Sequence, residues 1–244
     1  MALFVLQHGG SQGHWVWEET AALLLARGHR SILPDVPGCG AKRWRDCAAM
    51  PFDAIVAELA AEIDAAEPHA AGAILVGHSQ GGTLIAELAA ARPERFRHLV
   101  FLASGAPVQG TTMPEMIGDK PRGHDPERIG LPLDPATTDR MALRDIMFCN
   151  DMDEAFKPTY FARSRGHRWP AAAQEKRDWR YDHLAAFPST YIVCEQDNIL
   201  PVEWQLRFAE RFHCKQTARI DAGHQAMLTQ PDALVDLLAA IAAA

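Results

Sequence analysis

The sequence predicts an α/β domain in which a mostly parallel central sheet of about six strands is flanked by helices. Two observations predict it. Short apolar runs alternate with stretches of helical periodicity, and a Gly-x-Ser-x-Gly motif stands where one such run meets one such stretch. The chain has 244 residues, of which 48% are hydrophobic, which is enough for one large core. We therefore expect residues 1–244 to form a single domain.

Strands and helices alternate along the first hundred residues. Strands separated by helices indicate right-handed βαβ crossovers, and hence a parallel sheet covered on both faces. In order, the pattern predicts a strand at Leu3–Gln7, a helix from about His14 to Ala26, a strand at Arg30–Leu33, a helix from about Phe52 to Glu67, a strand at Ala73–Val76, a helix that stops near Arg92-Pro93, and a strand at His98–Leu102.

The alternation resumes near the end of the chain. The pattern there predicts a strand at Thr190–Cys194, a helix from about Val202 to Phe212, a strand at Lys215–Ile220 and a last helix from about Asp232. Residues 107–185 in between are rich in Pro, Gly, Met, Arg and aromatics and show helical periodicity only in patches. We expect them to form a helical cap, or lid, because long excursions from the carboxyl edge of a sheet are usually functional. The alternative is a subdomain that does not contact the site.

The serine motif has the form of a nucleophile elbow. Gly77-His78-Ser79-Gln80-Gly81 follows a buried strand and precedes a helix, so Ser79 is expected on the sharp turn that exposes its Oγ. Glycines on either side of the serine let neighbouring backbone pack closely against a strained residue. Ser79 is therefore the predicted nucleophile.

A serine hydroxyl needs a base and an orienting acid to act as a nucleophile at neutral pH. Among the eleven histidines we predict His224, because it lies in a loop between the last strand and the last helix. Asp197 follows the preceding strand and is the predicted acid, which gives the chain order Ser, Asp, His. Glu195 lies too close to its strand end, and Asp221 too close in sequence to His224, to serve as well.

The same chemistry needs donors for a developing oxyanion. We predict the backbone N–H of Gly10, in the turn His8-Gly9-Gly10-Ser11 after the first strand, and that of Gln80 at the positive end of the elbow helix.

Charge and cysteine content exclude other classes. A net charge of −7 gives no electrostatic footprint for nucleic acid or an anionic membrane. Five scattered cysteines, an odd number, suggest neither a zinc site nor a disulfide framework. The opening residues lack the pattern of a signal peptide, so we expect a cytoplasmic location. We expect no cofactor and no metal; a homodimer through the cap or the last helix stays open.

Three stretches resemble one family. Phe4 to Trp17 resembles the opening F-V-L-x-H-G-x-x-x-G-x-W-x-W of α/β-hydrolases that include plant methylesterases and hydroxynitrile lyases, and their bacterial relatives. Residues 197–201 and 223–228 resemble the acid and histidine loops of that group. The lyases in the group have a threonine where Gly9 stands and a lysine where Gln225 stands. Both lyase groups are missing here, so the resemblance implies ester hydrolysis rather than cyanohydrin cleavage.

We predict that one glycine of the first turn and four aromatic residues line the substrate pocket. They are Gly9, Trp15, Phe148, Tyr160 and Trp169. A stretch of arginines around Arg163, Arg165 and Arg168, continuing to Arg177 and Arg180, could receive an anionic substrate, but we expect a solvated helix face.

Together these features predict a serine hydrolase, without cofactor, that cleaves a small, largely apolar carboxylic ester through an acyl-enzyme intermediate. The alternatives on this scaffold are hydrolysis of an amide, carbamate or lactone, a lyase reaction, and a ligand receptor with vestigial hydrolase activity.

Overall fold

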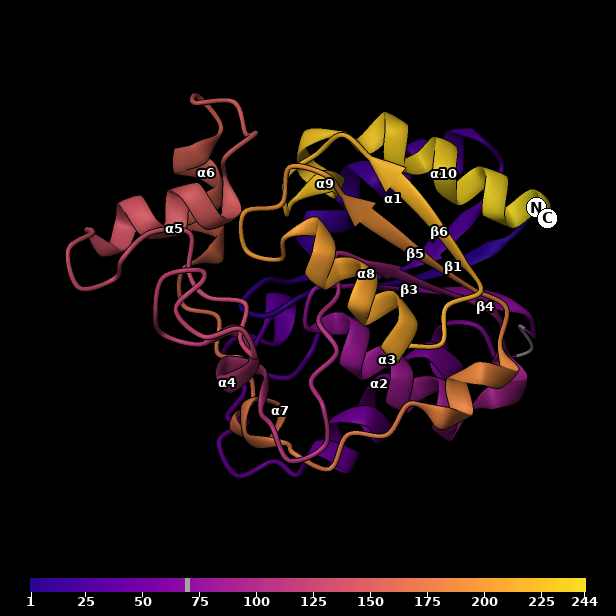
Figure 1. The fold of residues 1–244 in the computed structure, drawn as a ribbon. Coiled ribbons are helices and arrows are strands. Elements are labelled where there is room, and N and C mark those ends of the chain that lie inside the picture. The colour runs from indigo at the N-terminus through magenta and orange to yellow at the C-terminus, as the bar shows by residue number, and fades with distance from the viewer. Residues whose placement is uncertain (69–70) are drawn as a thin grey trace.

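A computed structural model describes residues 1–68 and 71–244, and the described residues contain one six-stranded sheet (Figure 1). Its spatial order is β2-β1-β3-β4-β5-β6, and all neighbouring strands are parallel. The strands are β1 (Leu3–Gln7), β2 (Arg30–Ile32), β3 (Ala73–His78), β4 (Phe96–Leu102), β5 (Ser189–Cys194) and β6 (Gln216–Ile220). The expected α/β fold with a parallel sheet of about six strands is confirmed.

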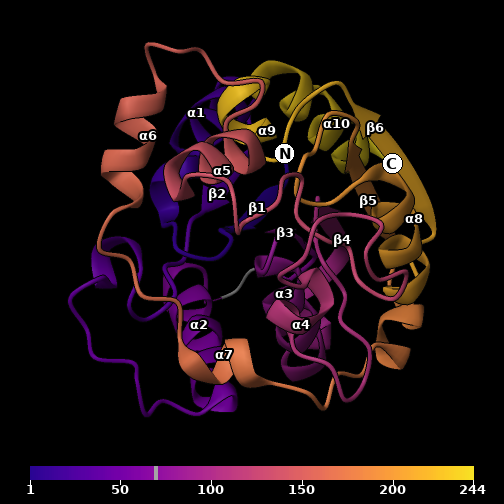
Figure 2. The same cartoon turned by 60° about the vertical axis from the view of Figure 1, so that its left-hand side comes forward.

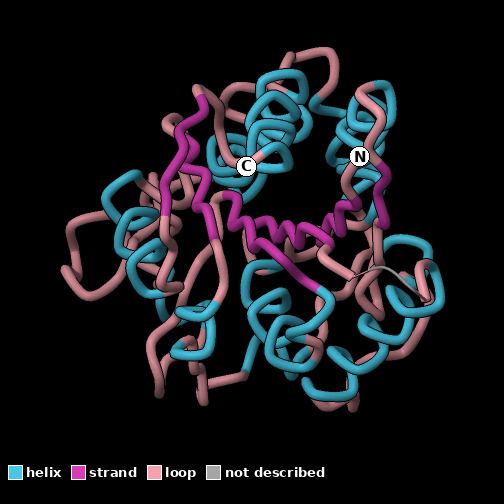
Figure 3. The backbone as a smooth tube through the Cα atoms, turned by 90° about the vertical axis from the view of Figure 1, so that its right-hand side faces the viewer, coloured by secondary structure: helices cyan, strands magenta, loops and turns pink. Residues whose placement is uncertain are grey.

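The central strands are buried on both sides. Every residue of β3 and of β5 is buried, which matches their continuous apolar runs. Parallel strands of this kind need helices on both faces, and Figures 1 and 3 show the sheet between two helical layers. One layer contains α1 (Glu18–Ala26) and α10 (Pro231–Ala243), which pack against each other, with the short α9 (Ala226–Thr229) beside them.

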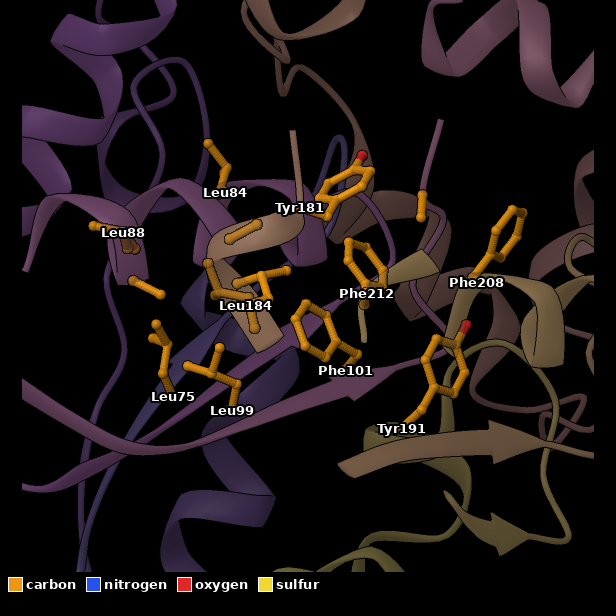
Figure 4. Packing of buried hydrophobic residues seen from close by; sticks show 14 of the residues in the cluster. Leu75, Leu84, Leu88, Leu99, Phe101, Tyr181, Leu184, Tyr191, Phe208 and Phe212 are labelled. Atoms are coloured by element: carbon orange, nitrogen blue, oxygen red, sulfur yellow. The ribbon is translucent and has the colours of Figure 1, made fainter. Parts of the chain in front are cut away.

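The opposite layer contains α2 (Phe52–Ala66), α3 (Gly81–Ala91) and α8 (Val202–Arg211). Between this layer and the sheet, aromatic rings pack in contact (Figure 4). Phe101 and Phe212 stack with centroids 4.1 Å apart, and Tyr181 meets Phe212 edge-on at 5.0 Å. Such pairs contribute about 0.5–1.5 kcal/mol each beyond the burial of their surface. This side of the core therefore fixes β4 and β5, whose carboxyl ends flank the site described below.

The long connection from β4 to β5 carries four short helices. They are α4 (Met113–Ile117), α5 (Arg140–Phe148), α6 (Lys157–Ser164) and α7 (Ala171–Glu175). All four lie beyond the carboxyl ends of the strands, opposite the amino ends of the sheet (Figures 1 and 2). The connection thus stands over the sheet edge at which parallel α/β folds bind ligands.

The helix expected from His14 to Ala26 begins differently from the prediction. Residues His14–Trp17 form a 3₁₀ turn, and the α-helix begins at Glu18. Trp15, Val16 and Trp17 are buried in that turn, so tertiary packing determines its geometry. Among the described residues, no helix is long and apolar enough to cross a membrane.

Candidate active site

Ser79 occupies the turn between β3 and α3 in a strained conformation. Its φ is +52°, in the left-handed region that non-glycine residues rarely adopt. Two close approaches require the flanking glycines. A Cβ on Gly77 would lie 2.8 Å from the carbonyl oxygen of Gly81, and a Cβ on Gly81 would lie 2.6 Å from that of His8. The strand, the glycines and the helix together hold the Ser79 side chain at the sheet edge.

Ser79, His224 and Asp197 form one hydrogen-bonded line. Nε2 of His224 lies 3.0 Å from Oγ of Ser79, and Nδ1 of His224 lies 2.7 Å from Oδ2 of Asp197. His224 is 1% exposed and Asp197 5% exposed, so water competes little with either bond. Oδ1 of Asp197 accepts the backbone N–H groups of Ile199 and Leu200, at 2.8 and 2.9 Å. The carboxylate is thereby fixed with its other oxygen toward the histidine.

The two competing acids are engaged elsewhere. Glu195 forms an exposed ion pair with Arg219 at 3.0 Å. Asp221 accepts a hydrogen bond from the Gln196 side chain at 2.5 Å. Of the acids weighed from the sequence, Asp197 is therefore the one that the structure brings to His224.

His78 packs beside the predicted base. Its Nε2 donates to the backbone carbonyl of His224 at 2.8 Å, and the two ring centroids lie 4.8 Å apart. Burial, together with the neighbouring His224, holds the pKa of His78 well below its ordinary value. His78 is thus a neutral donor that supports the His224 loop. Its place within the buried elbow is the only sequence signal for this role.

Gly10 and Gln80 lie side by side next to the serine. A Cβ on Gly10 would lie 2.8 Å from Nε2 of Gln80, and both residues line the same cavity as Ser79. Gln80 directly precedes α3, so its N–H points out of the positive end of that helix. Within the described part of the chain, neither backbone N–H donates a hydrogen bond to another residue. The two groups are available to an incoming oxygen.

A cavity of about 590 Å³ opens from Ser79 and His224. Much of its wall comes from the β4–β5 connection, including Met113, Leu143 and Met147. A larger groove of about 790 Å³ lies between α2, α3 and α7, but neither Ser79 nor His224 lines it. Volume alone therefore does not locate the site.

Two of the five predicted pocket residues line this cavity and three do not. The Phe148 ring lies edge-on to the His224 ring, with 5.7 Å between the centroids, and Tyr160 lines the same cavity. Trp15 packs behind Tyr160 at 6.0 Å, and Trp169 packs against His8 at 6.0 Å. Gly9 lies behind the elbow: a Cβ added to Gly9 would lie 3.0 Å from the Cβ atom of Ser79. Large aromatics in the sequence do not reveal which rings face a cavity and which support it.

A buried polar chain that sequence reasoning missed forms another part of the wall. The Gln12 side chain donates to Oε1 of Gln225 at 2.8 Å, and the Gln225 side chain donates to the Tyr160 hydroxyl at 3.2 Å. Gln225 is fully buried, and burial raises the pKa of Tyr160 to about 12. All three groups are neutral at physiological pH, so this part of the wall carries hydrogen-bonding groups without a charge.

An acid from the β4–β5 connection supports the histidine loop. Oδ2 of Asp151 accepts the backbone N–H of Gly223 at 2.6 Å and the Thr229 hydroxyl at 2.7 Å. Gly223 directly precedes His224, so this connection and the predicted base are linked through one carboxylate. Nothing in the local sequence around Asp151 points to this role, because its partners lie more than seventy residues away.

Comparison with known proteins points to one family. A model described as "Alpha/beta hydrolase family" matches residues 2–237. Methylesterase 1 of Arabidopsis thaliana is 25% identical over 98% of this chain and 95% of its own length, and Alpha-hydroxynitrile lyase of the same plant is 25% identical over 98% and 96%. The solved structure of polyneuridine aldehyde esterase superposes with a TM-score of 0.76, at 21% identity over 99% of both chains.

Proposed function

The chain belongs to the alpha/beta hydrolase family, and we propose that it is a serine esterase that cleaves a small, largely apolar carboxylic ester. The observation that carries this proposal is the hydrogen-bonded line from Ser79 through His224 to Asp197 at the wall of a cavity of about 590 Å³. Its relatives include proteins named as esterases, among them Methylesterase 1 of Arabidopsis thaliana.

In the proposed mechanism, Oγ of Ser79 attacks the ester carbonyl carbon while Nε2 of His224 takes the hydroxyl proton. Nδ1–H of His224 donates to Asp197, which selects the tautomer with a free Nε2 and stabilises the imidazolium that forms. The imidazolium then protonates the leaving alcohol, and an acyl-enzyme remains on Ser79. A water molecule deprotonated by His224 releases the acid and restores the serine.

The backbone N–H groups of Gly10 and Gln80 are proposed to hold the oxyanion of the tetrahedral intermediate. Both are free of protein acceptors in the described residues and both border Ser79. A single donor of this kind contributes about 10²–10³-fold to turnover. The proposed cap, residues 107–185, supplies much of the cavity wall and would exclude water from the acylation step.

One observation disfavours the lyase alternative. Gln225 stands where the related lyases carry a lysine, and its side chain is buried and bonded to Gln12 and Tyr160. A neutral amide at this place supplies no cation for a departing cyanide. Hydrolysis of an amide, carbamate or lactone uses the same nucleophile and remains the second candidate. A cytoplasmic location and a homodimer stay predictions from the sequence.

A p-nitrophenyl ester series tests the proposal. The wild-type protein should hydrolyse short acyl esters faster than long ones, because the cavity is of limited volume. Ser79→Ala should remove this activity without loss of secondary structure, as judged by circular dichroism. Retained turnover in the purified variant would overturn the assignment of the nucleophile.

A further inference from the structure

The cavity beside Ser79 has an unusual charge for this protein. The chain carries a net charge of −7, yet Arg140, Arg144 and Arg165 line the cavity and no aspartate or glutamate does. Within the described residues, none of these three arginines forms an ion pair. Three cations around a single cavity that no carboxylate lines give it a positive potential, which favours an anionic occupant.

Two of the three lie on one face of α5. Arg140, Arg144 and Phe148 are spaced four residues apart, so they share a face of the helix, and all three line the cavity. Phe148 packs edge-on to the His224 ring. With a rise of about 1.5 Å per residue, Arg144 lies about 6 Å and Arg140 about 12 Å from Phe148 along the helix axis.

The position of Arg140 is unfavourable for the helix itself. Arg140 is the first residue of α5, where the positive end of the helix dipole disfavours a cation. Lys157 and Arg163 provide the contrast. Both lie on α6, and both have carboxylate partners, Asp145 and Glu18 respectively, at 3.1 and 3.0 Å. The arginines that face the cavity thus differ from Lys157 and Arg163, whose charges are met by carboxylates.

Arg144 lies over an aromatic ring of α6. Its guanidinium lies 5.7 Å from the centre of the Phe161 ring, and the neighbouring Tyr160 lines the cavity together with Arg144. Along α5 the apolar Met147 lies between Arg144 and Phe148, and Leu143 also lines the cavity. An occupant that reaches from Ser79 to Arg144 therefore crosses an apolar stretch and ends at a cation.

We propose that the natural substrate is an ester that carries a carboxylate group at its other end, held by Arg144 and Arg140 while Ser79 attacks the ester carbonyl. This inference rests on the proposed function and names the substrate class of the same site. The planar guanidinium fork binds a carboxylate through two parallel hydrogen bonds, which a neutral ester cannot make. The arginines thus select among esters, and Ser79, His224 and Asp197 carry out the reaction.

Two matched pairs of esters test the inference. Monomethyl adipate against dimethyl adipate places the charge on the acyl side, and 4-carboxyphenyl acetate against phenyl acetate places it on the alcohol side. The measured quantity is the ratio of kcat/KM for the anionic ester to that for its neutral partner. For at least one pair we expect a ratio of about ten or more in the wild type, falling about tenfold in Arg144→Gln and also falling in Arg140→Gln.

Arg163→Gln is the matched control, because Arg163 belongs to the same connection but pairs with Glu18. It should leave the ratio unchanged. Titration with a fluorophosphonate gives the concentration of folded, reactive sites in each variant, so a misfolded sample cannot imitate the expected loss. If neutral esters are hydrolysed but anionic ones are no better, or if the ratio persists in both arginine variants, the inference is wrong and the esterase proposal stands. If no ester is hydrolysed in a Ser79-dependent way, both fail.

Discussion

His224 is held from three directions. Asp197 accepts from its imidazole, His78 donates to its backbone carbonyl, and Phe148 packs against its ring. Ser79 completes the arrangement at 3.0 Å. If His224 is the base that we propose, this support means that it needs little reorganisation before it takes a proton.

Asp197→Asn tests the acid at the residue scale. The amide oxygen can still accept from the N–H groups of Ile199 and Leu200, so the loop should keep its shape. The amide N–H₂, however, favours the wrong tautomer of His224. We expect kcat to fall by about 10³–10⁴-fold with little change in the free energy of unfolding. Near wild-type turnover in this variant would show that Asp197 does not orient the base.

Sequence reasoning identified Ser79, His224 and Asp197 because each belongs to a short motif next to a strand end. The structure brings these three together, while their catalytic roles remain a proposal. Sequence reasoning missed the roles of Gln12, His78 and Asp151, because their partners are distant in the chain and nothing in the local sequence specifies those partners. The same limit explains Trp15 and Trp169, which support the cavity from behind.

At the scale of elements, the β4–β5 connection contributes to both the cavity and the His224 loop. The contact through Asp151 is the sharpest case, since one carboxylate bonds Gly223 and Thr229 on the loop. We propose that this contact keeps His224 aligned with Ser79. The proposed cap would then have a positioning role in addition to lining the proposed substrate site.

Asp151→Ala should lower kcat by about tenfold or more, because the Gly223 N–H loses its acceptor and the histidine loop loosens. The buried unpaired donor should also lower the free energy of unfolding by about 1–3 kcal/mol. Kinetics and urea unfolding measure the two effects. Asp134→Ala is the control, because Asp134 is exposed and its carboxylate caps only its own turn. Equal behaviour of the two variants would contradict this role for Asp151.

The regular elements were predictable because burial dictates their pattern. All six strands were predicted with ends within two residues of those observed. The four inner strands contain buried apolar runs, whereas the edge strands β2 and β6 are mostly polar and partly exposed. The helices of the β4–β5 connection were not placed individually. They have five to nine residues, too few for helical periodicity to identify, and they depend on packing at the sheet edge.

For the whole molecule, buried histidines predict a loss of stability in acid. Burial lowers the pKa of His8 to about 4 and that of His78 well below its ordinary value of 6.5. Below about pH 6.5 the unfolded chain binds protons at these residues, whereas the folded chain does not. The stability that these two histidines contribute should therefore be complete above about pH 6.5. The free energy of unfolding should then fall as the pH drops toward 4, by up to about 1.4 kcal/mol per pH unit for each histidine.

Urea unfolding at a series of pH values between about 7 and 5 measures this dependence. His78→Gln should reduce the slope, because one of these two histidines with a strongly lowered pKa is removed. A free energy of unfolding that stays constant or rises as the pH falls from 7 to 5 would contradict the assignment of these histidines as neutral in the fold.

The most direct test of the account is intact-mass spectrometry after treatment with a fluorophosphonate, which reacts with an activated serine. If Ser79 is a nucleophile activated by His224, the wild-type protein should carry a single adduct and Ser79→Ala none. No adduct on the wild type, or an adduct that persists in the variant, would contradict the claim that Ser79 is a nucleophile activated by His224.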